Sequence, residues 1–198
     1  MQARALGVFV GLVASVSVAS VASAEGGRSS TVKMVGMGEA PVAFRASVPL
    51  AGLTQQTADI NMDRVVDQHV FVDGAGLTRS AVRDIDFDGR ADVVEFFSAS
   101  GEVLERQFQM DFDPYVDVVR LYEGGRLTQK LVATGFDGSL SLEKYYDIQG
   151  NLSRTARDSN FDGRADLWEY YSEGKVVNIT RDLNGDGEAE TIEEVEAK

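Results

Sequence analysis

The sequence predicts an all-β protein of six β-hairpin repeats, each 24–25 residues long, which form a meander or spiral sheet with acidic loops between the hairpins. Two recurrences support this prediction: acidic segments return at that interval, and an aromatic or apolar pair followed by a glycine lies between them. The spacing decides between helix and strand. An acidic loop of 12 residues leaves 12 or 13 before the next one. That space holds two strands of about five or six residues and a turn, but not two helices of about 10–14 residues.

The N-terminal segment has the pattern of a secretory signal peptide. Residues 1–24 contain Arg4, an apolar run and a final Ala22-Ser23-Ala24, in the order in which a signal peptide places its basic, hydrophobic and cleavage regions. We therefore expect an exported chain, periplasmic or extracellular, cleaved near Ala24 and without a membrane span in its mature form. Residues 25–58 are predicted to be a linker with a capping strand, and residues 59–198 the repeat domain.

Six units fill the repeat domain. They begin at positions 59, 84, 109, 133, 158 and 182. The acidic pattern is complete in three units, at Asp84–Glu95, Asp158–Glu169 and Asp182–Glu193. The other three depart from it, at Arg64, Val70, Gln109, Pro114, Arg120, Ala133, Gly135 and Lys144. We therefore expect a cation site only in the three complete units.

Each unit also carries the residues of a hairpin. The recurring pairs are followed within a few residues by a glycine, and Val, Ile, Thr, Tyr and Phe dominate the flanking segments, which is typical of strands broken by a turn. The pairs are Phe71-Val72, Phe96-Phe97, Leu121-Tyr122, Tyr145-Tyr146 and Tyr170-Tyr171. Because neighbouring strand residues point to opposite faces, each pair is expected to place bulk on both faces of the sheet.

The acidic loops are predicted to bind Ca²⁺, a hard cation that takes six to eight oxygen ligands. Side chains at loop positions 1, 3 and 5 can converge on one point, and glycine at position 6 allows the sharp bend. Position 7 is expected to supply its carbonyl, position 9 to bind directly or through water, and the final glutamate to occupy the bidentate position. The expected ligands are Asp84, Asp86, Asp88, Arg90, Asp92 and Glu95; Asp158, Asn160, Asp162, Arg164, Asp166 and Glu169; and Asp182, Asn184, Asp186, Glu188, Glu190 and Glu193.

These three segments resemble calcium-binding loops of the EF-hand type, since each matches D-x-[DN]-x-[DN]-G-x₅-E. Similar acidic loops occur in dockerins, thrombospondin type 3 repeats and integrin-like repeats. The resemblance implies calcium as the ligand, but on a hairpin scaffold rather than between helices. A second resemblance, at Tyr146–Leu152, is to a YD (Rhs-type) repeat, which is also a hairpin.

Composition excludes several other functions. The formal net charge of −13 argues against nucleic acid as a partner, and the chain has no cysteine for disulfides or thiolate chemistry. His69 is the only histidine, and no nucleophile elbow accompanies it, so we expect no enzyme, no catalytic residues and no organic cofactor. The expected function is a structural or adhesive calcium-binding repeat protein with a surface or envelope protein as partner. The alternatives are a metal-independent interaction module, whose aspartates serve only as turn formers, and a hydrolase that uses paired carboxylates.

Overall fold

A computed structural model describes residues 52–111, 113, 115–135 and 138–194, all within one compact unit, residues 33–198. These residues contain twelve β-strands and no helix. No segment among them is therefore a helix long and apolar enough to cross a membrane. The signal peptide and most of the predicted linker lie outside the described residues. The strands are β1 Thr54–Ala58, β2 Gln68–Val72, β3 Thr78–Arg83, β4 Val93–Phe97, β5 Val103–Phe108, β6 Val118–Glu123, β7 Arg126–Ala133, β8 Leu140–Tyr146, β9 Leu152–Arg157, β10 Leu167–Ser172, β11 Lys175–Arg181 and β12 Thr191–Glu194.

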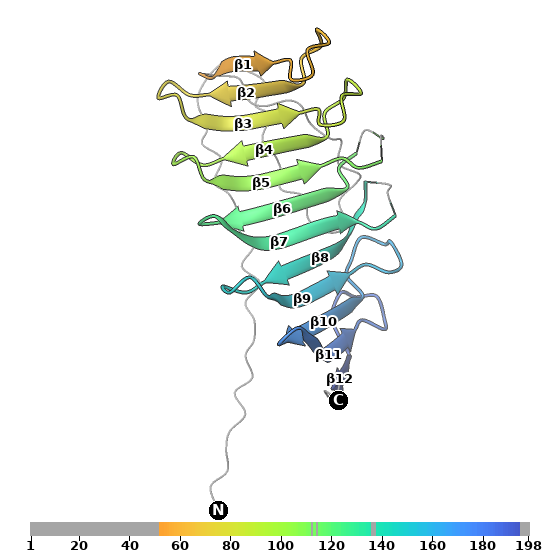
Figure 1. Cartoon of the computed structure of the whole chain (residues 1–198). Helices are drawn as coiled ribbons and strands as arrows, with labels where there is room; N and C mark the ends of the chain where they lie inside the picture. Colours follow the sequence, from red (N-terminus) through yellow and green to blue (C-terminus); the bar gives the residue numbers. More distant parts are fainter. Residues whose placement is uncertain (1–51, 112, 114, 136–137, 195–198) are drawn as a thin grey trace, which may run out of the picture. The chain divides into compact units, whose positions relative to one another are not determined.

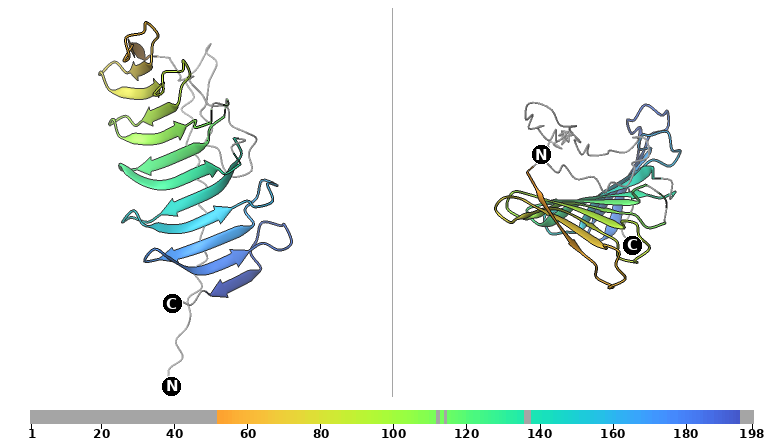
Figure 2. Two further views of the ribbon diagram at one scale, coloured as in Figure 1. Left: turned by 45° about the vertical axis from the view of Figure 1, so that its right-hand side comes forward. Right: turned by 90° about the horizontal axis from the view of Figure 1, so that it is seen from above.

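The twelve strands form one antiparallel sheet in which each strand pairs with its neighbours in the chain, from β1 to β12 (Figure 1). The predicted all-β meander is confirmed, in its open rather than its spiral form. Successive strands are rotated relative to one another (Figure 2), as expected from the right-handed twist of strands. β1 and β12 are the two edges of the described sheet, and β1 falls within the segment predicted to hold a capping strand.

The two ends of the strands carry different connections (Figure 1). Short turns follow the even-numbered strands, whereas the predicted acidic segments follow the odd-numbered ones. The register shifts by one residue at the aromatic or apolar pair of all five hairpins. The glycine that follows each pair has positive φ, for example +80° at Gly76 and +85° at Gly150. Each pair and glycine therefore encode a bulged turn, because a bulge adds a residue and glycine accepts positive φ.

Cross-strand register separates the side chains into two faces. One face, which we call the core face, holds Phe71, Val82 and Val94 in one buried cluster and Val119 and Leu131 in another. Val94 is 0% and Leu131 1% exposed. The opposite face carries charged side chains from β3 to β10, including Glu95, Arg106 and Lys130.

Candidate cation-binding loops

Five of the six connections that follow the odd-numbered strands are nine-residue loops of one recurring design; the sixth, between β7 and β8, has six residues. Four of them are 59–67, 84–92, 158–166 and 182–190, and each begins directly after its strand ends. The backbone N–H of the ninth residue donates to the carbonyl of the residue before the loop, for example Asp92 to Arg83 at 2.8 Å. The loop at 109–117 shares this closure through Asp117 and Phe108, at 2.9 Å. The backbone hydrogen bonds between the two strands thus continue across the base of each loop.

The carboxylate of the ninth residue closes the loop a second time. In loop 84–92, Asp92 Oδ2 accepts hydrogen bonds from the backbone N–H groups of Ile85 at 2.6 Å and Asp86 at 3.2 Å. The equivalent acceptors elsewhere are Asp67, Asp117, Asp166 and Glu190. Asp67 and Asp117 are 2% and 1% exposed. This closing role is not predicted by the calcium-loop pattern, in which position 9 is an ion ligand, although the nine-residue spacing of the carboxylate recurs in all five loops, including those of Asp67 and Asp117.

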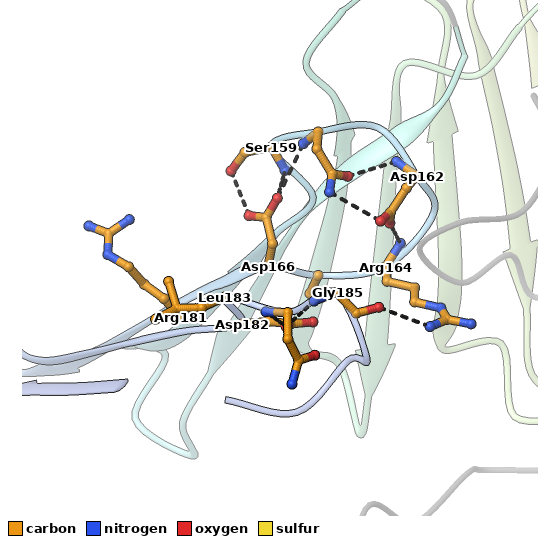
Figure 3. Close-up of a pocket in the computed structure, with 11 residues that line it drawn as sticks. Ser159, Asp162, Arg164, Asp166, Arg181, Asp182, Leu183 and Gly185 are labelled. Atoms are coloured by element: carbon orange, nitrogen blue, oxygen red, sulfur yellow. Dashed lines mark hydrogen bonds between the residues drawn. The ribbon is translucent and has the colours of Figure 1, made fainter. Parts of the chain in front are cut away.

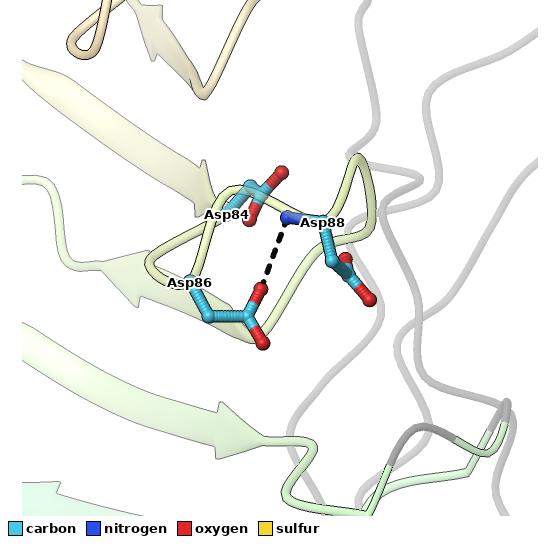
Figure 4. Close-up of side chains that lie close together, drawn as sticks. All are labelled: Asp84, Asp86 and Asp88. Atoms are coloured by element: carbon cyan, nitrogen blue, oxygen red, sulfur yellow. Dashed lines mark hydrogen bonds between the residues drawn. The ribbon is translucent and has the colours of Figure 1, made fainter.

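The first carboxylate organises the interior of the loop. Asp84 Oδ1 accepts from the Phe87 N–H at 2.7 Å, and its Oδ2 accepts from the Gly89 N–H at 2.8 Å. Further along, the Asp88 N–H donates to Asp86 and the Arg90 N–H to Asp88, at 3.1 and 2.8 Å. One carboxylate oxygen each of Asp84, Asp86 and Asp88 lies within 4.8 Å of the others (Figure 4). The structure therefore brings together the residues predicted at positions 1, 3 and 5.

Two loop positions, 4 and 6, lie in the left-handed region of backbone space. Phe87 and Gly89 have φ of +65° and +88°. The corresponding pairs are Met62 and Arg64, Phe161 and Gly163, and Gly185 and Gly187. The sequence predicted the left-handed conformation at position 6 but not at position 4, where three of the four loops adopt it without glycine and Gly185 was the only signal. Because positive φ strains residues that carry a Cβ, Arg64 indicates a strained loop at 59–67.

Electrostatic repulsion accompanies this convergence. Although Asp86 is exposed, partial desolvation by the loop raises its pKa, and the neighbouring charges of Asp92, Asp88 and Asp84 raise it further. Burial also raises the pKa of Asp117, with a contribution from Asp111 and Asp113. Three or four carboxylates within one loop disfavour one another's ionised forms, and a cation among them would reverse that effect.

Loop 182–190 gathers a different set of carboxylates, Asp182, Asp186 and Glu190, which also lie within 4.8 Å of one another. Burial acts to raise the pKa of Asp182, but the hydrogen bonds that its carboxylate accepts, led by those from the Gly187 and Gly185 N–H groups, lower it overall. This loop and loop 158–166 line a pocket of about 450 Å³ (Figure 3). Arg164 Nη1 joins the two loops by donating to the Gly185 carbonyl at 3.2 Å.

Loop 158–166 shares most of these backbone hydrogen bonds but not the same convergence. The Gly163 N–H donates to Asp158 at 2.8 Å, and the Asn160 side-chain amide donates to Asp162 at 3.1 Å. Among the residues that the structure describes, its three carboxylates do not form a group within 4.8 Å. At position 3, Asn160 offers a neutral amide oxygen where loop 84–92 has the carboxylate of Asp86.

The final glutamates of the 12-residue pattern belong to strands rather than to loops. Glu95 lies on β4, 4% exposed, where its carboxylate accepts from Arg83 and, at 2.7 Å, from Arg106. Glu169 lies on β10 and accepts from the hydroxyls of Thr155 at 3.1 Å and Tyr171 at 2.8 Å. Glu95 and Glu169, predicted to occupy the bidentate position, thus have partners within the sheet, because each strand begins directly after the ninth loop position. Glu193 lies on β12, and its side chain is outside the described residues.

His69 and the nearby Asp67 have separate hydrogen-bond partners. His69 Nδ1 lies 2.7 Å from Gln55 Nε2 on the adjacent strand. Asp67 instead accepts from the Ile60 N–H at 2.6 Å. Asp67 and His69 thus serve loop closure and strand pairing.

No family model matches the chain, and no curated protein matches it. Solved structures similar to part of it include a GtfA/B complex, at 14% identity and a TM-score of 0.39 over 52% of this chain and 19% of that one. TarM of S. aureus has 12% identity and a TM-score of 0.31, over 64% of this chain and 21% of that one. The structure of accessory secretory protein 1, 2 and 3 of Streptococcus pneumoniae has 10% identity and a TM-score of 0.35, over 69% of this chain and 22% of that one. The chain spans about a fifth of these structures, which identify neither its family nor its activity.

Proposed function

We propose that this chain is an exported, non-enzymatic repeat protein whose acidic loops bind Ca²⁺ and so fix the hairpins of the sheet. The convergence of Asp84, Asp86 and Asp88 within 4.8 Å carries the proposal. Carboxylate oxygens at alternate positions of a tight loop are the ligands that Ca²⁺ takes. Mg²⁺ fits less well, because it demands a stricter octahedron and keeps several waters.

The loops differ in the sites they offer. Loop 84–92 supplies three carboxylates with Asp92 as closing residue, and loop 182–190 supplies Asp182, Asp186 and Glu190. Loop 158–166 requires a rearrangement of Asn160 or a bridging water to bring its ligands together. We therefore expect stronger binding in loops 84–92 and 182–190 than in loop 158–166, with dissociation constants of about 10⁻⁴–10⁻³ M, as in extracellular modules.

A metal-independent interaction module is the second candidate. It is favoured by the hydrogen bonds of the loops themselves, since Asp84 and Asp92 already accept backbone N–H groups. Such contacts satisfy the loop without an ion, as in turns built from Asp and Asn. The two candidates differ in whether the loop carboxylates are ligands or only turn residues.

Calorimetric titration of metal-free protein with calcium chloride separates them. We expect binding heat in the wild-type chain and a smaller stoichiometry in Asp88→Ala, because position 5, an aspartate in all three loops, then loses its charged oxygen ligand. Glu123→Gln, an exposed acid at the opposite end of the strands, changes the net charge equally and should leave the titration unchanged. Absence of heat in the wild-type chain would favour the metal-independent module.

A further inference from the structure

A row of four basic side chains crosses the centre of the sheet opposite the core face. Arg106 on β5 pairs with Arg120 on β6, Arg120 with Lys130 on β7, and Lys130 with Lys144 on β8. Directly opposed residues share a face, and neighbouring strands lie about 4.8 Å apart, so the four residues form a line about 14 Å long. We call this row the basic ladder.

The four side chains of the ladder differ in their partners. Arg106 is bound to Glu95 at 2.7 Å, and it lies over the Tyr122 ring at 5.6 Å. Arg120 lies over the Phe108 ring at 4.7 Å. Within the part of the chain that the structure describes, no ion pair is recorded for Arg120, Lys130 or Lys144.

The ladder is costly for the fold. Like charges directly opposite each other destabilise a sheet. Burial lowers the pKa of Lys130, and the charges of Arg120 and Lys144 lower it further. Three adjacent strands thus hold cations where neutral residues would be more stable, which points to a role outside folding.

The acidic loops do not cancel this charge. Arg106 precedes the loop at 109–117 by three residues, or about 10 Å of strand. Opposed charges farther apart than the Debye length of about 8 Å are largely screened at physiological salt. Glu95 bounds the ladder on one side, and Thr155 followed by Glu169 bounds it on the other. The positive strip is therefore local and short.

Two tyrosines extend the ladder on the same face. Tyr122 follows Arg120 by two residues on β6, and Tyr146 follows Lys144 by two residues on β8; both are half-buried. An aromatic ring offers an apolar face next to a polar hydroxyl, which suits the packing of a sugar ring. A line of cations beside tyrosine rings therefore complements a linear ligand that carries both anionic groups and sugar rings.

We propose that the basic ladder, with Tyr122 and Tyr146, docks a linear sulfated polysaccharide. The sulfates would pair with Arg120, Lys130 and Lys144, and sugar rings would pack on the tyrosines. This inference does not depend on calcium binding.

Titration of the full chain with dextran sulfate at physiological salt tests it, with uncharged dextran as the control ligand. The double variant Lys130→Gln/Lys144→Gln should weaken binding at least tenfold, and each single variant should give an intermediate loss. Arg126→Gln/Lys175→Gln removes the same charge from exposed positions at the turn edge and should bind as the wild type does. Because the ladder variant relieves repulsion, its melting temperature should equal or exceed that of the wild type, so the loss would not reflect unfolding.

Three results would overturn the proposal. Equal weakening of dextran sulfate binding in both double variants would mean that binding depends only on net charge. Tighter binding of a single-stranded oligonucleotide, again dependent on the ladder, would replace the polysaccharide with a nucleic acid. Self-association at low salt that disappears in Lys130→Gln/Lys144→Gln would assign the face to a second copy of this chain.

Discussion

The Asp92 carboxylate lies 2.6 Å from the backbone nitrogen of Ile85, seven residues earlier in the chain. Asp92 is 9% exposed, so this charged acceptor is withdrawn from water and satisfied by the loop. The ninth residue therefore holds the loop in shape whether or not an ion is bound.

Replacement of Asp92 should weaken the sheet itself. Asp92→Ala leaves the Ile85 N–H without its acceptor, and hydrogen bonds to charged groups contribute about 1.5–3 kcal/mol. We expect a loss of that order in the free energy of unfolding of metal-free protein, measured by urea denaturation. Asp88→Asn, at an exposed loop position, should have a much smaller effect, and equal effects would contradict the closing role of Asp92.

Gly89 is expected to be required by its backbone conformation. Its φ is +88°, and a Cβ built there meets no atom within 4 Å, so backbone strain alone opposes a side chain. Gly89→Ala should lower the free energy of unfolding by about 1–2 kcal/mol. Part of this loss is offset because alanine reduces the conformational entropy of the unfolded chain. Gly74, equally open but without positive φ, is the matched control: Gly74→Ala should be neutral or stabilising by up to about 1 kcal/mol. Similar losses in both variants would refute the strain argument.

Glu95 should matter for stability and not for calcium. Glu95→Gln weakens its pairs with Arg83 and Arg106, whose side chains are 37% exposed. We expect the free energy of unfolding to fall by about 1–3 kcal/mol, which lies between the values for exposed and buried ion pairs. Calorimetry should give the same calcium stoichiometry as the wild type. A lost site would restore Glu95 as the bidentate ligand of a 12-residue loop.

Tyr145 should make the fold sensitive to alkali. Burial, and then the hydrogen bond that its hydroxyl donates to Glu143, raise the pKa of Tyr145 to about 12. The folded chain keeps this proton where the unfolded chain, with a pKa of about 10, loses it. The stabilisation is therefore fully present below about pH 10 and is lost as the pH rises through about 12. Urea denaturation across this range should show a shallower decline in Tyr145→Phe, whereas Tyr170→Phe, at an exposed position, should follow the wild type.

Periodicity made the fold predictable, because each local pattern specifies one local structure. The spacing of the acidic loops excluded helices, and pairs such as Phe96-Phe97 marked the bulged end of each hairpin. The face of Glu95 was not predictable from a loop formula, since it depends on where β4 begins and on Arg106 from the next strand. The role of Asp92 was missed for a related reason: a carboxylate that accepts backbone N–H groups and one that binds an ion have the same sequence pattern. The basic ladder required the register of four strands.

Thermal unfolding of the full chain in calcium and in chelator tests the central claim most directly. At a calcium concentration ten times the dissociation constant, each occupied loop adds about 1.4 kcal/mol, so two loops should raise the melting temperature by several degrees. The triple variant Asp88→Asn/Asp162→Asn/Asp186→Asn should lose most of that rise. Identical melting curves in calcium and chelator for the wild-type chain would contradict the account and leave the aspartates as turn residues.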